Sequence, residues 1–102
     1  MSVPAFHFVA FKWKKGAPID LIEKVFDEQK EKICDEIPGI HSLVWGENSS
    51  PYNKGYTHGL IVQADNQDAI DRYRASKLRE LTVPLFSEWV EDATSVDLSN
   101  LG

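Results

Sequence analysis

The sequence predicts one α+β domain, residues 1–102, in which four antiparallel strands carry helices on one face. A chain of 102 residues can bury one hydrophobic core and is too short for two. Its composition, 42% hydrophobic and 26% charged residues, is typical of globular proteins. Stretches with the period-two alternation of strands and stretches with the three-to-four-residue spacing of helices follow one another as strand, helix, strand, strand, helices and strand.

The first strand is expected at residues 3–13, where Phe, Val and Trp favour a pleated backbone. Because side chains alternate across a strand, its residues divide into two sets: His7, Val9, Phe11 and Trp13 on one face, and Phe6, Phe8, Ala10 and Lys12 on the other. Both sets are mainly apolar. The strand therefore needs cover on both sides.

A helix is expected after the Gly- and Pro-containing connection at residues 14–18. Asp20, with Glu23 three residues later, has the spacing of a capping box. One face of this helix is formed by residues that recur at spacings of three and four, mainly apolar: Ile22, Val25, Phe26, Gln29, Ile33 and Ile37. The charged side chains on the rest of the helix, including that of Glu23, are interpreted as solvent-facing. Pro38 and Gly39 are expected to end the helix.

The second half of the chain predicts strands at residues 40–46, 56–64 and 92–98, with a polar loop at 47–55. Asp65 or Asn66 is expected to cap a helix whose Ala69, Ile70 and Tyr73 face inward. A further helical stretch contains Leu81, Leu85, Phe86 and Trp89. Two strand–helix–strand crossovers, each leaving a gap that another strand fills, give the split, ferredoxin-like β-α-β-β-α-β arrangement.

This arrangement leaves the sheet face with Phe6, Phe8 and Ile61 without helical cover. A soluble monomer rarely exposes an apolar patch of that size. The sequence therefore predicts a homodimer in which two sheets pack face to face.

Charge and motifs exclude several classes of function. The net charge of −5 argues against nucleic-acid binding, which needs clustered Lys and Arg. No stretch approaches the roughly 20 apolar residues of a membrane helix, and no signal peptide is evident, so we expect a cytoplasmic protein with no membrane partner. One cysteine, Cys34, excludes an internal disulfide. No phosphate-binding loop and no hydrolase triad is recognisable, and His7 with His58 gives only two metal ligands, so neither a cofactor nor a metal is expected.

Histidine is the side chain that most readily exchanges protons near neutral pH. His7 and His58 are expected to face the helices, and the same alternation places Tyr56 with them. The separation of the two histidines depends on a strand register that the sequence does not give. Either both make local hydrogen bonds under the helices, or they contact a ligand. His41 is interpreted as a surface residue.

The chain resembles the stress-responsive dimeric α/β-barrel family over nearly its whole length. The resemblance depends on the opening strand with His7, the 37–40 junction Ile-Pro-Gly-Ile, Trp45-Gly46, the 55–58 segment Gly-Tyr-Thr-His, Tyr73 and Trp89. It implies a ferredoxin-like subunit that pairs sheet to sheet, with a pocket between helices and sheet. Some members are plant stress proteins, and others are cofactor-free enzymes, a polyketide cyclase and a hydroxynitrile lyase.

In those enzymes the resemblance points to acid–base chemistry by a Tyr and a His in a Tyr-x-x-His-Pro-x-His segment. Here the segment reads Tyr-Arg-Ala-Ser-Lys-Leu-Arg over residues 73–79, so Tyr73 matches the family tyrosine but Arg79 stands at the usual base. Arginine stays protonated and cannot act as a base. It can instead hold a carboxylate or a developing enolate.

Three functions follow from these observations. The first is a homodimer that binds a small apolar or aromatic molecule, with polar contacts from His7, His58, Tyr73 and Arg79. The pocket is then expected to be lined by Val9, Phe11, Phe26, Leu60, Ile70, Phe86 and Trp89. The second is a cyclase or lyase in which His7 or His58 replaces the missing base and Tyr73 is the acid. The third is a non-catalytic stress protein whose own side chains fill the pocket.

Overall fold

A computed structural model describes residues 4–99 and shows the predicted ferredoxin-like fold. The elements follow the chain as β1 (Ala5–Trp13), α1 (Ile19–Glu36), β2 (Ile40–Glu47), β3 (His58–Ala64), α2 (Gln67–Arg74), α3 (Lys77–Thr82), the 3₁₀ turns η1 (Val83–Leu85) and η2 (Ser87–Trp89), and β4 (Val90–Leu98). The strands form one antiparallel sheet in the order β2-β3-β1-β4. Both crossovers are present, because β1 and β2 lie either side of β3, and β4 lies beyond β1.

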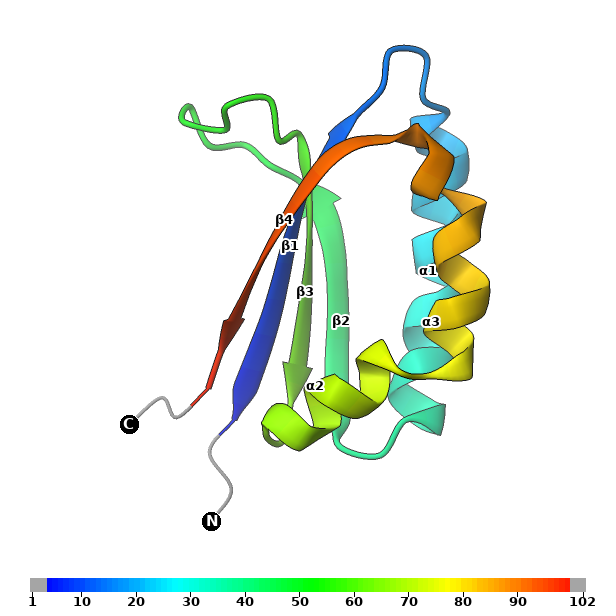
Figure 1. The fold of residues 1–102 in the computed structure, drawn as a ribbon, viewed down its shortest axis with the longest axis vertical. Coiled ribbons are helices and arrows are strands. Elements are labelled where there is room, and N and C mark those ends of the chain that lie inside the picture. Colours follow the sequence, from blue (N-terminus) through cyan, green and yellow to red (C-terminus); the bar gives the residue numbers. More distant parts are fainter. Residues whose placement is uncertain (1–3, 100–102) are drawn as a thin grey trace.

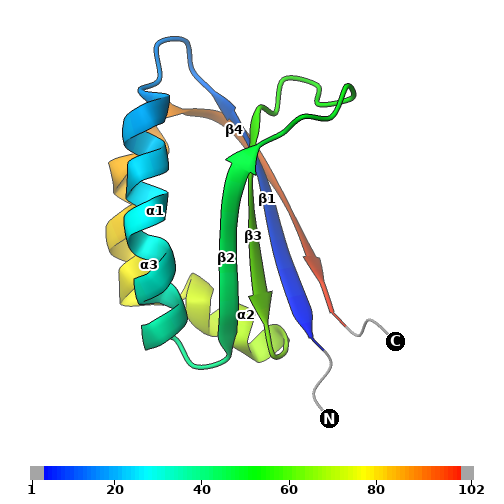
Figure 2. The same cartoon turned by 180° about the vertical axis from the view of Figure 1, so that it is seen from behind.

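The helices cover one face of the sheet and leave the other bare (Figures 1 and 2). Apolar residues of β1, β2 and β3 pack under α1 and α2 to form the core, whose most completely buried large side chains are Ile22, Val62 and Ile70. At one end of this layer aromatic rings stack closely, with Phe26 of α1 4.1 Å from Trp45 of β2 between ring centroids. The alternation predicted along β1 therefore describes its environment correctly. Within residues 4–99, no helix has the length and apolarity that crossing a bilayer requires.

The bare face carries apolar side chains from all four strands. Val44, Ile61, Val96 and Leu98 are between 37% and 57% exposed on it. The register places Val96 opposite Phe8, and Leu98 opposite Phe6, so β4 extends the same apolar surface. We call this set, Phe6, Phe8, Val44, Ile61, Val96 and Leu98, the outer face.

Several predicted boundaries differ from the structure: β2 extends one residue further, to Glu47, and β4 begins two residues earlier, at Val90. Helix α1 begins at Ile19 with Pro18 in the cap position and no side-chain cap, so Asp20 lies in the first turn and its prediction as the cap is wrong. Strand β3 begins at His58, because Tyr56 lies in a turn in which its N–H donates to the carbonyl of Asn53. Asn66 does cap α2, accepting from the N–H of Ala69. Residue 3, the predicted start of β1, lies outside the described residues.

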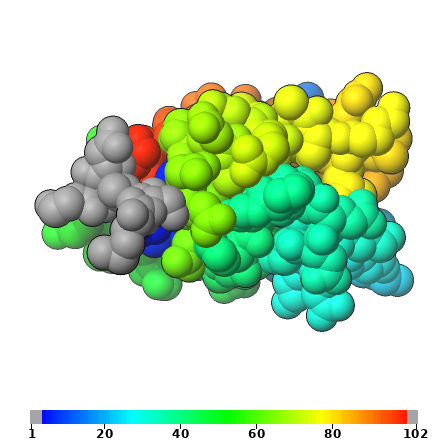
Figure 3. Space-filling model, turned by 90° about the horizontal axis from the view of Figure 1, so that it is seen from below, coloured from blue at the N-terminus to red at the C-terminus, as the bar shows by residue number. Residues whose placement is uncertain are grey.

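The turn after α1 packs tightly against α2. Gly39 has a φ of +89°, and a Cβ at this position would lie 2.8 Å from the Cβ of Ala69. Arg72 of the same helix donates from Nη2 to the carbonyl oxygen of Pro38 at 3.0 Å. Figure 3 shows α2 side by side with the end of α1 at this end of the molecule. The Pro38-Gly39 turn thus ends α1 and contacts α2, which fixes the position of α2 against the end of α1.

We expect Gly39→Ala to lower the free energy of unfolding by about 2–4 kcal/mol, because it adds both left-handed backbone strain and a steric clash. Urea denaturation at fixed protein concentration measures the change. Gly16→Ala is the matched control: Gly16 has a φ of +84° with open space around the added Cβ. It should cost only the strain, about 1–2 kcal/mol. Equal losses in the two variants would contradict the packing argument.

Candidate functional site

His7, Asp97 and Arg74 meet at one end of the layer between helices and sheet. The β1–β4 register places His7 directly opposite Asp97, and His7 Nδ1 lies 2.6 Å from Asp97 Oδ1. Arg74, at the end of α2, donates from Nη2 to the other carboxylate oxygen of Asp97. His7 is only 3% exposed. We call these three residues the polar cluster.

The contact with Asp97 fixes the tautomer of His7. An ionised carboxylate can only accept, so Nδ1 carries the proton, and Arg74 Nη2, 3.3 Å from the same nitrogen, cannot donate to it as well. The neutral ring therefore has its lone pair on Nε2, to which no other described residue donates. A carboxylate behind Nδ1 stabilises the imidazolium that forms when Nε2 takes a proton. This geometry leaves Nε2 of His7 able to accept a hydrogen bond or a proton.

The protonation of Asp97 supports this arrangement. Partial burial favours its neutral form, but the hydrogen bonds and charges of His7 and Arg74 outweigh burial and lower the pKa of the Asp97 carboxyl below its ordinary value. The carboxyl is therefore ionised at neutral pH.

Tyr73 lies beside the polar cluster and stays protonated. Its ring centroid is 5.9 Å from that of His7, and the guanidinium carbon of Arg79 is 6.0 Å from the Tyr73 ring centroid. Burial raises the pKa of the Tyr73 hydroxyl, and the nearby charges of Arg79 and Arg74 offset this only in part. The neighbouring cations favour the ionised form of Tyr73, but the effect of burial is larger. Tyr73 can donate a hydrogen bond or a proton at neutral pH.

A cavity of about 470 Å³ connects these side chains. Eight residues named from the sequence line it: His7, Val9, Phe11, Phe26, Leu60, Tyr73, Arg79 and Phe86. Arg74 and Gln29 also line it, and the buried Oε1 of Gln29 has no hydrogen-bond partner among the described residues. The cavity is therefore an apolar chamber with polar groups at defined points, one of which still needs a donor.

Some of the predicted pocket residues lie elsewhere. Ile70 is fully buried in the core, and Trp89 packs against the outside of that core. Neither residue is part of the cavity wall. Tyr56 does not face the helices, because it lies in the turn before β3 and donates its hydroxyl to Asp92 at 2.6 Å. His41 is exposed, as expected, and hydrogen-bonds Asp65.

His58 is far from His7. It pairs with Phe11 in the β1–β3 register, four residues along β1 from His7, which corresponds to about 13 Å at 3.3 Å per residue. Its ring is held between two indoles: Trp45 stacks on it at 5.4 Å between centroids, and Trp13 donates from Nε1 to His58 Nδ1 at 3.1 Å. The two predicted histidines thus belong to different ends of the layer.

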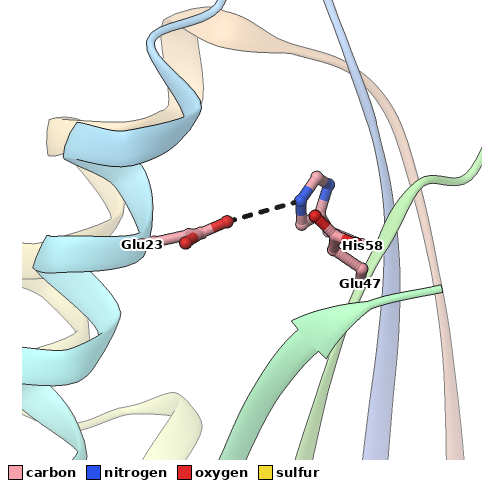
Figure 4. A group of neighbouring side chains, drawn as sticks. All are labelled: Glu23, Glu47 and His58. Carbon is pink, nitrogen blue, oxygen red and sulfur yellow. Dashed lines mark ion pairs between the residues drawn. The ribbon is translucent and has the colours of Figure 1, made fainter.

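Two glutamates join His58 at its end. One ligand atom each of Glu23, Glu47 and His58 lie within 4.8 Å of one another (Figure 4). The charge pattern of the first helix predicted a solvent-facing Glu23, and the two predicted ligands, His7 and His58, lie at different ends of the layer. Among the described residues, this is a set of donors with the chemistry to hold a metal ion.

Sequence reasoning also missed Asp97 and Arg74. Asp97 stands 90 positions from His7, and it shares the less apolar face of the strand predicted at residues 92–98 with Ala93 and Ser95. The β1–β4 register is the signal that identifies Asp97, because it places this carboxylate opposite the buried His7.

Comparison with known proteins agrees with this fold. The sequence profile of the stress responsive A/B barrel domain family matches residues 5–100. A family member from Mesorhizobium loti with a ferredoxin-like fold is 27% identical, with a TM-score of 0.74, 98% of this chain and 99% of that one being covered. No protein of curated function matches the chain significantly.

Two more distant structures share the fold. A dimeric ferredoxin-like protein from Thermobifida fusca YX is 16% identical with a TM-score of 0.78, over 97% of this chain and 92% of that one. The hydroxynitrile lyase from Passiflora edulis is 14% identical with a TM-score of 0.79, over 97% of this chain and 94% of the lyase. At such identities the likeness concerns the fold alone.

We expect Asp97→Asn to lower the free energy of unfolding at pH 7 by about 1 kcal/mol and to flatten its acid dependence. Because the folded-state pKa of Asp97 is lowered, its stabilisation is complete above the ordinary carboxyl pKa of about 4 and is lost as the pH falls through the lowered value. Urea denaturation between pH 2 and 7 measures both effects. Asp35→Asn, an exposed carboxylate on α1, is the control. An acid profile of Asp97→Asn that matches the wild type would contradict the polar cluster.

Proposed function

The chain belongs to the stress-responsive A/B barrel domain family, and we propose that it forms a homodimer that binds a small apolar or aromatic molecule in the cavity between its helices and sheet. The observation that carries this proposal is the cavity itself. It is large enough for a one- or two-ring compound, and it joins an apolar wall to the polar cluster. A stress protein whose own side chains fill this space would lack such a chamber.

The polar groups indicate which ligand suits the cavity. Arg74 and Arg79 bring positive charge to one wall, and Tyr73 can donate to a carbonyl or carboxylate oxygen. Gln29 Oε1 needs a donor, which a ligand hydroxyl can supply. An aromatic acid or hydroxylated aromatic carbonyl compound matches these groups.

A second candidate, a cofactor-free acid–base enzyme, is favoured by the geometry of His7. His7 lines the cavity, and because Asp97 holds its Nδ1, the ring's lone pair is on Nε2. In this reading His7 takes a proton from the substrate and Tyr73 donates to the oxygen or leaving group. His7 would then do the work of the family histidine that Arg79 replaces.

The substitution Tyr73→Phe separates the two candidates. We expect it to weaken the binding of 2-naphthoate by roughly 2–10-fold, the effect of one lost hydrogen bond, as measured by calorimetric titration. If the chain is an enzyme of the lyase type, the wild type also releases cyanide from mandelonitrile, and Tyr73→Phe abolishes that release.

Tyr52→Phe is the matched control, because Tyr52 is 85% exposed and is not part of the cavity wall. It should leave both readouts unchanged. Failure of 2-naphthoate to bind, or equal binding by wild type and Tyr73→Phe, would refute the proposed cavity site.

The proposed dimer rests on the outer face. Its six apolar side chains come from all four strands and carry no helical cover, and a structural relative from Thermobifida fusca is described as dimeric. The opposing Gly46 and Gly59 of β2 and β3 form part of a hollow on this face, lined also by Phe8 and Val96, which a partner side chain can fill. A second sheet provides the cover that β1 requires.

We expect light scattering to give the mass of a dimer for the wild type and of a monomer for Ile61→Asp, because a charge at the centre of the outer face would be buried unpaired. Leu81→Asp is the control, since Leu81 of α3 is 60% exposed on the helical side. It should remain dimeric. Circular dichroism shows whether Ile61→Asp is still folded, and a folded, dimeric Ile61→Asp variant would overturn the sheet-to-sheet arrangement.

A further inference from the structure

Glu23, Glu47 and His58 converge at the end of the layer opposite the polar cluster, outside the cavity described above. Each comes from a different element: Glu23 from α1, Glu47 from the last position of β2, and His58 from the first position of β3. Glu47 and His58 are directly paired across the two strands, so their side chains share the helix-facing side of the sheet. Figure 4 shows Glu23 reaching from α1 toward the imidazole, with Glu47 beside the ring.

His58 presents a nitrogen that lacks a partner. The residue is 7% exposed, and its buried Nε2 makes no hydrogen bond to any other described residue. The nearest carboxylate oxygen, Glu23 Oε1, is 3.7 Å away, too far for a hydrogen bond. A buried polar atom left in this state costs about 1–3 kcal/mol.

The carboxylates also lack a cation. Among residues 4–99, no Lys or Arg nitrogen comes within 4.0 Å of a carboxylate oxygen of Glu23 or Glu47, and His58 is the only ion-pair partner found for either. Two negative groups beside a buried imidazole nitrogen form a site for positive charge.

We propose that Glu23, Glu47 and His58 bind a divalent first-row transition metal ion such as Zn²⁺. Two carboxylate oxygens and one imidazole nitrogen are a donor set that Zn²⁺ accepts, with a fourth position left for water. Zinc–ligand distances of about 2.1 Å place tetrahedral ligand atoms about 3.4 Å apart. The pair Glu23–His58 is already at 3.7 Å, and the remaining contraction falls on glutamate side chains at the surface.

The surroundings of His58 supply the second layer of contacts. A metal ion on Nε2 requires the proton on Nδ1, and Thr57 Oγ1, 2.9 Å from Nδ1, can accept that proton in a hydrogen bond. Trp13, which donates to Nδ1 in the metal-free protein, then loses its acceptor. Metal binding should therefore change the environment of Trp13, and Trp45 stacked on the same ring adds a second reporter.

Titration of the full, tag-free chain with Zn²⁺ tests the proposal, with calorimetry for stoichiometry and tryptophan fluorescence for location. We expect one Zn²⁺ per chain with a saturable change in fluorescence, and no displacement by a hundredfold excess of Mg²⁺, which prefers all-oxygen sites. Glu47→Gln should weaken Zn²⁺ binding at least about tenfold. Glu47 is exposed, so this variant is expected to fold.

Two controls make the result decisive. Glu28→Gln removes the same charge from an exposed position of α1 outside the site and should bind Zn²⁺ as the wild type does. His41→Ala tests whether the exposed His41–Asp65 pair is the true ligand. No binding by the wild type, unchanged binding by Glu47→Gln, or loss of binding in His41→Ala would each overturn the proposal.

Discussion

The strict alternation of side chains along β1 is the constraint on which this structure depends. One set of residues, from His7 to Trp13, is driven under the helices, and the other, from Phe6 to Ala10, is driven to the outer face. A shift of one residue would expose the aromatic cluster and bury Lys12. Because β1 lies at the centre of the sheet, its register with β3 and β4 also determines which side chains of those strands meet His7 and which meet Phe11.

That register divides the chemistry of the chain into two places. His7 receives Asp97 from β4 and Arg74 from α2, and it faces a cavity. His58, four residue positions away along the sheet, receives indoles and carboxylates instead. His7 thus has a carboxylate on one ring nitrogen and a free lone pair on the other, whereas the ring of His58 lies between two indoles. The rings of Phe11, Phe26 and Phe86 contact one another in this layer and form part of the cavity wall.

The fold could be predicted from the sequence because it depends on periodicity, which is local. The alternation in β1 and β3, the spacing of Ile22 and Phe26, and the Pro38-Gly39 stop are each visible within a few residues. The site could be predicted only in part. Tyr73 and Arg79 are close in sequence and both line the cavity, whereas Asp97, Glu23 and Glu47 reach their histidines across elements. Whether these residues meet depends on the strand register and on how α1 is oriented over the sheet. Neither can be deduced from a local sequence pattern.

Strand β4 has one neighbour in the sheet, β1, and Asp97 lies on it between Val96 and Leu98. The two apolar residues point to the outer face, and the carboxylate between them points to His7. In a dimer that covers the outer face, contact with the partner would hold β4 in place and, through it, the anion behind the histidine. Dimer formation would then also fix the polar cluster, and a subunit without its partner would lack a fixed carboxylate behind His7.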